Sequence, residues 1–134
     1  MYGPPGTAYV YLIYGIHHCL NVVCLAEGRP HAVLIRGIAP EVGVPLMARR
    51  RGREVVPGRV SRGGLTDGPG KLCQAFAIDK TLDGHDLRHK PLYLKENKAE
   101  YDRLQVEATP RIGISSAQDK LLRFIISGNK YLSR

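Results

Sequence analysis

Three short apolar runs occupy the first part of the chain. Residues 8–14 are rich in β-branched and aromatic side chains, as strands are, and Gly15 ends this run. Two further apolar runs cover residues 19–25 and 31–38, and the turn-forming stretch 27–30 separates them. Because short connections usually join antiparallel neighbours, the pattern predicts a three-stranded antiparallel meander.

The middle of the chain predicts two helices. Pro45 suits the first turn of a short helix over residues 42–52, and the arginines at its far end complement the helix dipole. Residues 71–78 place apolar side chains at helical spacing, so they predict a second helix. Asp67 or Gly68 is the expected cap of that second helix.

The remaining segments complete the expected fold. Residues 56–70 contain Gly, Pro, Ser and Asp throughout and predict a loop. Apolar runs at residues 91–95, 104–109 and 122–127 predict three more strands. The expectation is a mixed α/β (α+β) fold, one domain over residues 1–134, with a mostly antiparallel curved sheet and a few flanking helices.

Composition narrows the class of protein. A chain of 134 residues with 43% hydrophobic residues is large enough for one domain with its own core, and too apolar for a disordered segment. Twenty Lys and Arg against 12 Asp and Glu give a net charge of +8. That excess favours a polyanionic partner, with nucleic acid first and an anionic membrane surface second. A basic protein with no such partner is the alternative.

Cysteine usage and the N-terminus bear on the compartment. The three cysteines are an odd number without CxxC spacing, so buried reduced thiols are expected rather than disulfides or structural zinc. The sequence lacks the basic start, apolar stretch and cleavage site of a signal peptide. Its longest apolar run, residues 8–14, is far shorter than the roughly 20 residues of a membrane span. A cytoplasmic protein is therefore expected.

Three tyrosines form an aromatic group in the first predicted strand. Strand alternation puts Tyr9 and Tyr11 on one face and Tyr14 on the other, at the end beside Gly15. On a basic protein such rings can stack on nucleic-acid bases, although aromatic residues are common in strands for packing reasons alone.

The next predicted strand carries polar side chains in an apolar context. His17, His18 and Cys19 are adjacent, and neighbours on a strand point to opposite faces, so no metal site is expected there. Asn21 lies inside an apolar run. Because a buried amide must be hydrogen-bonded, Asn21 either ties down backbone or faces a polar pocket.

The arginines raise a similar question. Arg36 lies in the third apolar run, where a guanidinium needs an acceptor unless it faces solvent at a sheet edge. A basic set follows along the chain: Arg49, Arg50, Arg51, Arg53, Arg59, Arg62 and Lys71. Such a set can bind phosphates, whereas a solvated face is the usual explanation for charge runs. The sequence contains no G-x-S-x-G, Walker A or H-E-x-x-H motif, so these residues alone indicate a basic α/β domain suited to nucleic acid.

In six ordered segments the chain resembles the alkyladenine (3-methyladenine, methylpurine) DNA glycosylase family. The segments are GPPGTAYVYLIYG (3–15), CLN (19–21), AVLIR (32–36), GPGKLCQAFAI (68–78), RIGI (111–114) and LRFIISG (122–128). That family hydrolyses the N-glycosidic bond of alkylated or deaminated purines in base-excision repair, after flipping the damaged nucleotide into a pocket. The resemblance implies a monofunctional enzyme without metal or cofactor, acting as a monomer on double-stranded DNA with damaged purines, with no membrane partner.

The resemblance also implies roles for individual residues. Tyr14 is similar to the wedge that enters the minor groove and fills the gap left by the flipped base. Tyr11 is similar to the pocket wall that stacks on the purine, and Asn21 to the side chain that crowds guanine's exocyclic amino group. Arg36 resembles a water-positioning residue, aided by the backbone carbonyl of Ile126. The further DNA-binding residues expected are Arg49, Arg50, Arg51 and Lys71.

One part of the family pattern is missing. Members carry a segment ahead of the Gly-Pro-Pro-Gly turn, with a His and a Tyr that contact the base and a Glu-Ala-Tyr motif whose glutamate is the general base. None of the glutamates present stands in that motif: Glu27, Glu41, Glu54, Glu96, Glu100 and Glu107. General-base assistance contributes about 10²–10⁴-fold. We therefore expect an N-terminally truncated glycosylase that is weak or inactive; a catalytically dead remnant that binds distorted duplex DNA is the alternative.

Overall fold

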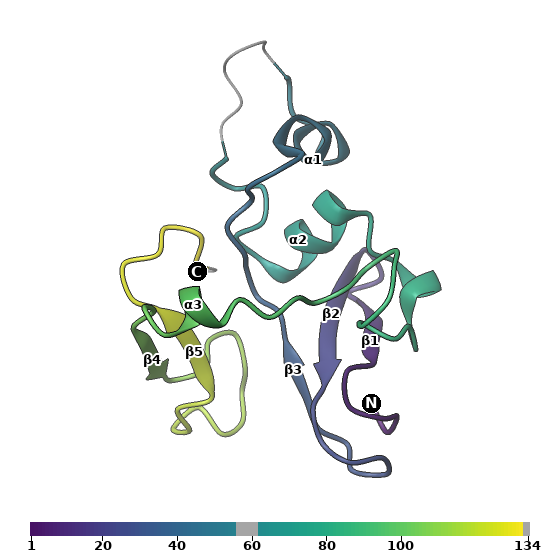
Figure 1. Ribbon diagram of the computed structural model, residues 1–134, viewed down its shortest axis with the longest axis vertical. Coiled ribbons are helices and arrows are strands. Elements are labelled where there is room, and N and C mark those ends of the chain that lie inside the picture. Colours follow the sequence, from purple (N-terminus) through teal and green to yellow (C-terminus); the bar gives the residue numbers. More distant parts are fainter. Residues whose placement is uncertain (56–61, 133–134) are drawn as a thin grey trace.

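The computed structural model describes residues 1–55 and 62–132. Strands β1 (Ala8–Ile13), β2 (His17–Val23) and β3 (Ala32–Leu34) form an antiparallel sheet in the order β1-β2-β3. This sheet confirms the predicted meander. It lies at the lower right of Figure 1, where the chain also begins.

The third strand is shorter than predicted. β3 ends at Leu34, whereas the apolar run continues to residue 38. Beyond the strand the chain leaves the sheet, and the backbone N–H of Ile38 donates to the carbonyl of Thr66 at 3.2 Å. Arg36 therefore lies on a connecting segment and not within a strand, which corrects the sequence-based expectation.

Helices lie across one end of this sheet. The two predicted helices are confirmed as α1 (Val44–Arg50) and α2 (Pro69–Phe76), and Gly68 occupies the N-cap of α2. A 3-10 turn, η1 (Lys80–Leu82), and a short helix, α3 (Lys98–Tyr101), were not predicted. In Figure 1, α2 lies above the three-stranded sheet and α1 lies beyond α2.

The last strands form a sheet of their own. β4 (Val106–Thr109) and β5 (Arg123–Ile126) pair antiparallel, separate from β1-β2-β3 (Figure 1). The mixed fold of helices and antiparallel strands is thus confirmed, with its described strands divided between two sheets.

One predicted strand is wrong. Residues 91–95 form no strand, because Pro91 has no N–H to donate to a ladder and the segment follows a connection between η1 and α3. The backbone N–H of Leu94 donates to the carbonyl of Leu87 at 2.8 Å, which attaches the segment without extending a sheet. The first part of the loop expected over residues 56–70, including Arg59, lies outside the described residues.

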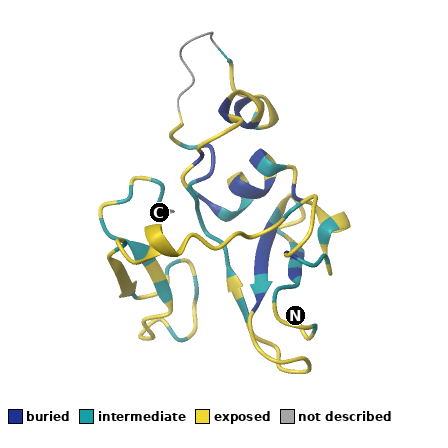
Figure 2. Cartoon of the chain, viewed as in Figure 1, coloured by how far each residue is buried: buried dark blue, intermediate teal, exposed yellow. Residues whose placement is uncertain are grey.

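Helix α2 joins two clusters of buried apolar residues. The first is formed mainly with β1 and β2: Ala8, Val10, Leu20, Leu72, Cys73, Ile78 and Leu87. The second is formed with α1: Val44, Met47, Ala48, Leu65 and Ala75. Figure 2 shows burial concentrated on β1, β2, α2 and one side of α1, whereas α3 and β4 are exposed. The other face carries the half-buried Tyr9 and Tyr11 of β1 beside the buried Cys19 and Asn21 of β2, so that face is partly covered as well.

Asp83 ties β1 to the turn after η1. Its Oδ1 accepts a hydrogen bond from the backbone N–H of Val10 at 2.9 Å, and its Oδ2 accepts from Lys80 Nζ at 2.6 Å. Lys80 Nζ also donates to the Val10 carbonyl at 3.2 Å. The hydrogen bond from Lys80 is the main cause that holds the pKa of Asp83 below its ordinary value.

We expect Asp83→Asn to lower the free energy of unfolding at neutral pH by about 1–2 kcal/mol, because Val10 and Lys80 lose a charged acceptor. A carboxylate whose pKa is lower in the folded state stabilises the fold at pH values above its unfolded-state pKa. This contribution is lost as the pH falls through the folded-state pKa. Urea unfolding should therefore show a difference in the free energy of unfolding between wild type and Asp83→Asn at neutral pH, and this difference should narrow below about pH 4. A difference that does not change with pH would contradict the role given to the Asp83 carboxylate.

Candidate functional site

The turn between β1 and β2 presents an aromatic ring to solvent. Tyr14 has φ 54° and Gly15 has φ 70°, and the N–H of Ile16 donates to the carbonyl of Ile13 at 3.3 Å. Positive φ at two successive turn residues matches the right-handed twist of a hairpin. Tyr14 is 85% exposed, and a bulky residue with positive φ is strained. The chain thus carries a strained conformation at the position of its most exposed tyrosine among the described residues.

A second group of side chains lies on one face of the same hairpin. The rings of Tyr9 and Tyr11 have centroids 5.4 Å apart and planes tilted by 33°, which confirms that the two share a face. In the register of the two strands, Tyr11 pairs with Cys19 and Tyr9 pairs with Asn21. Burial, followed by the interaction with Cys19, raises the pKa of the Tyr11 phenol. The Tyr11 phenol is therefore neutral at neutral pH.

Asn21 ties down backbone. Its side chain is 7% exposed, and its Nδ2 donates to the carbonyl of Tyr9 at 3.1 Å. The sequence left open whether Asn21 ties down backbone or faces a polar pocket, and this hydrogen bond supports the first. The bond crosses from β2 to β1, so it fixes the amide beside the tyrosine face.

Arg36 approaches the same face from the segment after β3. It is half-buried, and burial is the main cause that lowers the pKa of its guanidinium, followed by repulsion from Arg123. Its charge also acts on Cys19, where it partly offsets the effect of burial, which raises the pKa of the thiol. Because Cys19 lies opposite Tyr11, the structure brings Arg36, Tyr11 and Asn21 into one region.

Ile126 lies at the end of β5. Its backbone carbonyl accepts from the N–H of Asn129 at 3.1 Å. A carbonyl oxygen has two lone pairs, so the same atom can also accept from a water. The stretch after β5 returns to the segment that carries Arg36: a Cβ on Gly37 would lie 2.6 Å from the Tyr131 carbonyl oxygen.

The basic residues predicted to bind DNA lie on α1, at its end, and on α2. Arg49 is exposed on the last turn of α1. The others have partners within the chain: Arg50 Nη1 donates to the Ala75 carbonyl at 3.2 Å, Arg51 Nη1 to Gln74 Oε1, and Lys71 Nζ to Asp67 Oδ1 at 2.9 Å. Arg50 and Arg51 therefore join α1 to α2, a structural role that is compatible with phosphate contacts from their remaining donors.

The site contains two residues that the sequence analysis left without a role. Arg123 and Arg111 both repel Arg36, and both lie in the segments that carry the family resemblance. The cysteines also differ from expectation. All three are unpaired, but only Cys19 and Cys73 are buried, whereas Cys24 is exposed beyond the end of β2.

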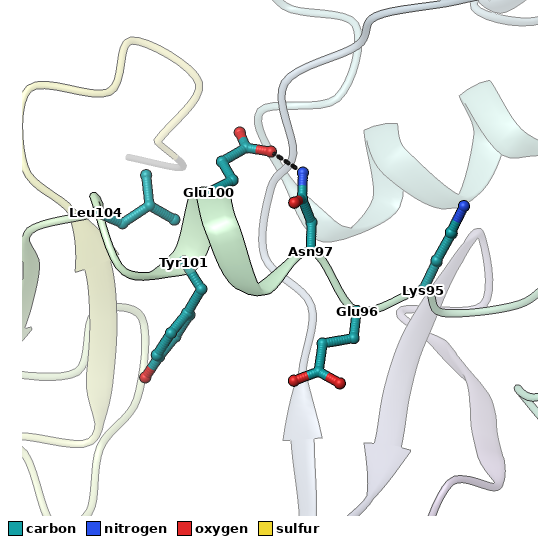
Figure 3. Close-up of a pocket in the computed structure, with 6 residues that line it drawn as sticks. All are labelled: Lys95, Glu96, Asn97, Glu100, Tyr101 and Leu104. Atoms are coloured by element: carbon teal, nitrogen blue, oxygen red, sulfur yellow. Dashed lines mark hydrogen bonds between the residues drawn. The ribbon is translucent and has the colours of Figure 1, made fainter.

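A shallow hollow lies elsewhere, around α3. It measures about 420 Å³ and is lined by Lys95, Glu96, Asn97, Glu100, Tyr101 and Leu104. Figure 3 shows these side chains diverging, with Glu96 and Glu100 pointing to opposite sides of the segment. None of the predicted site residues lines this hollow, and diverging side chains cannot enclose a ligand.

Residues 1–55 and 62–132 contain no group of three His, Cys, Asp or Glu side chains placed to hold a metal ion. None of their helices has the length and hydropathy needed to cross a bilayer.

Comparison with known proteins identifies the family of the chain. Residues 1–130 match the model of the family described as methylpurine-DNA glycosylase. A relative from Methanoculleus marisnigri is 44% identical over 136 positions, covering 100% of this chain and 68% of its own length. One from Desulfitobacterium hafniense is 43% identical, covering 99% of this chain and 67% of its own. Both are provisionally named 3-methyladenine DNA glycosylases. By these matches, the chain belongs to the methylpurine-DNA glycosylase family.

Proposed function

We propose that this chain binds duplex DNA at a damaged purine and holds the flipped nucleotide against the tyrosine face of β1 and β2. The observation that carries the proposal is the β1–β2 hairpin, which puts an exposed ring at its tip and a half-buried ring and an amide on one face. Tyr14 enters the minor groove and replaces the extruded base. The base then stacks on Tyr11 beside Asn21.

The reaction assigned to this site is hydrolysis of the N-glycosidic bond. Arg36 and the carbonyl of Ile126 orient the attacking water, the first as a donor and the second as an acceptor. The family's base is a glutamate in a Glu-Ala-Tyr motif, and residues 1–134 contain no such triplet. We infer that these 134 residues alone bind the damaged duplex and hydrolyse it weakly or not at all.

A single-turnover assay on a hypoxanthine-containing duplex tests this proposal. We expect the purified chain to bind the damaged duplex more tightly than an undamaged duplex of the same sequence. We expect its excision rate to be at least about 10²-fold lower than that of a relative that carries the Glu-Ala-Tyr motif. Equal binding to both duplexes would overturn damage recognition. Robust excision by the 134 residues would overturn the dependence on that glutamate.

A binding module without catalysis is the second candidate. It is favoured by the strain at Tyr14, which serves DNA insertion whether or not a base is cut. The same assay separates weak catalysis from none. Measurable excision above the uncatalysed rate supports the glycosylase, whereas preference for the damaged duplex with no excision at any protein concentration supports the binding module.

A further inference from the structure

The β4–β5 hairpin has one face that is entirely apolar. Val106 pairs with Ile126 and Ala108 pairs with Phe124, and alternation along each strand puts these four side chains on the same face. Phe124 is 67% exposed and Val106 is 49% exposed, while Ala108 is exposed and Ile126 is half-buried. Water therefore contacts a surface whose side chains offer it no hydrogen-bonding group.

The opposite face of the hairpin is mostly polar, yet it is the less exposed of the two. It carries Glu107, Thr109, Arg123 and Ile125, of which only Glu107 is exposed. Glu107 accepts a hydrogen bond from Ser127 Oγ, and Arg123 Nη1 donates to Thr109 Oγ1 at 3.2 Å. A sheet with one solvated face normally turns its polar side outward, so the hairpin has the reverse arrangement.

No helix or other strand packs extensively on the hairpin. Within residues 1–55 and 62–132, β4 and β5 contact mainly each other, whereas β2 also packs on α2 and β1 on η1. Figure 1 shows the hairpin as a separate sheet, and Figure 2 shows β4 exposed along its length. A two-stranded hairpin needs a packing partner to be more than marginally stable in water. The apolar face is thus the surface on which a partner element is missing.

Charge argues against two possible occupants of this face. Nucleic acid is disfavoured because none of the four side chains on the face is a cation that could contact a phosphate. A second copy of the chain is disfavoured because each copy has a net charge of +8, and the two would repel each other.

The length of the relatives indicates a third occupant. The match to the Methanoculleus marisnigri relative covers the whole of this chain but only 68% of that protein, and for Desulfitobacterium hafniense the share is 67%. About a third of each relative therefore has no counterpart in these 134 residues. Additional polypeptide of that size can supply the element that the hairpin lacks.

We propose that the apolar face of the β4–β5 hairpin binds the polypeptide segment that precedes the matched positions in such relatives. Apolar side chains of that segment cover Phe124 and Val106. The same hairpin carries Ile126, whose backbone carbonyl orients the attacking water in the proposed function. A segment bound to this face lies beside that water, which is where the glutamate of a Glu-Ala-Tyr motif is needed. The inference rests on the proposed function and assigns it a polypeptide partner.

Binding of the segment in the absence of DNA tests the surface. The preceding segment of each of the two relatives is expressed as a separate polypeptide and titrated into the full 134-residue chain by calorimetry. We expect Phe124→Thr to weaken binding about 10- to 100-fold and Val106→Thr about 3- to 10-fold. Val33→Thr makes the same change at a 53% exposed position of β3 and should leave the affinity unchanged.

Two further measurements keep this test independent of folding. Because the three replaced side chains are exposed, the urea midpoints of the variants should match that of the wild type when no segment is present. If Phe124→Thr unfolds the hairpin, Val106→Thr against Val33→Thr still decides. Bound segment should slow amide hydrogen exchange in β4 and β5 while exchange in α1 stays unchanged.

Three results overturn the docking surface. The first is no binding by the segment of either relative. The second is equal affinity of wild type, Phe124→Thr and Val106→Thr for the segment. The third is self-association of the chain alone that Phe124→Thr abolishes, since the face would then belong to a second copy.

Excision separates this inference from the proposed function. Saturating segment should raise single-turnover excision from a hypoxanthine-containing duplex by about 10²-fold or more. Segment binding at the hairpin without a rise in excision overturns the placement of the glutamate beside Ile126. Segment binding by a chain that does not prefer the damaged duplex overturns the proposed function alone, whereas preference for that duplex without segment binding overturns the docking surface alone.

Discussion

Replacing Tyr14 by asparagine is expected to weaken binding to a hypoxanthine-containing duplex roughly 5- to 150-fold while making the fold slightly more stable. The loss follows from removal of a ring that stacks in the duplex, a contribution of about 1–3 kcal/mol. The gain, about 0.5–1 kcal/mol, follows because asparagine adopts positive φ more readily than tyrosine, and Tyr14 has φ 54°. Fluorescence anisotropy measures the first effect and urea unfolding the second.

Tyr101 provides the matched control for this variant. It is 68% exposed on α3 and lines the hollow of Figure 3, far along the chain from the hairpin. Tyr101→Asn also removes an exposed ring and should leave duplex binding unchanged. Loss of binding in both variants would show that exposed rings contribute without regard to position, and loss of stability in Tyr14→Asn would refute the strain at the turn.

How far the sequence predicts this molecule depends on how local each feature is. Alternation within residues 8–14 is sufficient to place Tyr9 and Tyr11 together, and Gly15 marks the turn, because both depend on adjacent residues only. The same reasoning fails at residues 91–95, where composition resembles a strand but no partner strand is available. Whether a segment forms a strand depends on a partner strand, and that partner lies elsewhere in the sequence, where local composition does not predict it.

The features of the candidate site also differ in how far the local sequence predicts them. For Asn21 the sequence left two alternatives, and the hydrogen bond from its Nδ2 to the Tyr9 carbonyl supports the first, a tie to the backbone. The contact between Gly37 and the stretch after β5 could not be predicted, because it joins residues far apart in the chain and no periodicity reveals it. The family resemblance pointed to Arg36 and Ile126, but only the fold shows the stretch after β5 in contact with the segment that carries Arg36.

Gly37→Ala is expected to move the stretch after β5 away from the segment that carries Arg36. The added Cβ would lie 2.6 Å from a backbone oxygen of Tyr131 and 3.3 Å from one of Thr66. Thr66 cannot move easily, because it is fully buried and its Oγ1 donates to the Ile38 carbonyl at 2.7 Å. The stretch after β5 must therefore shift, at a cost of about 1–3 kcal/mol in the free energy of unfolding.

The shift has a local signature that distinguishes it from general destabilisation. The N–H of Tyr131 donates to Asn129 Oδ1 at 2.8 Å, and that of Asn129 donates to the Ile126 carbonyl at 3.1 Å. Hydrogen exchange at these two amides should accelerate in Gly37→Ala before exchange in β1 and β2 does. Gly3→Ala is the control, because its Cβ would meet only ordinary contacts, the closest being Thr7 Oγ1 at 3.7 Å. Uniform acceleration across both sheets would show that Gly37 supports the whole fold, whereas selective acceleration would show that it holds the stretch after β5 in place.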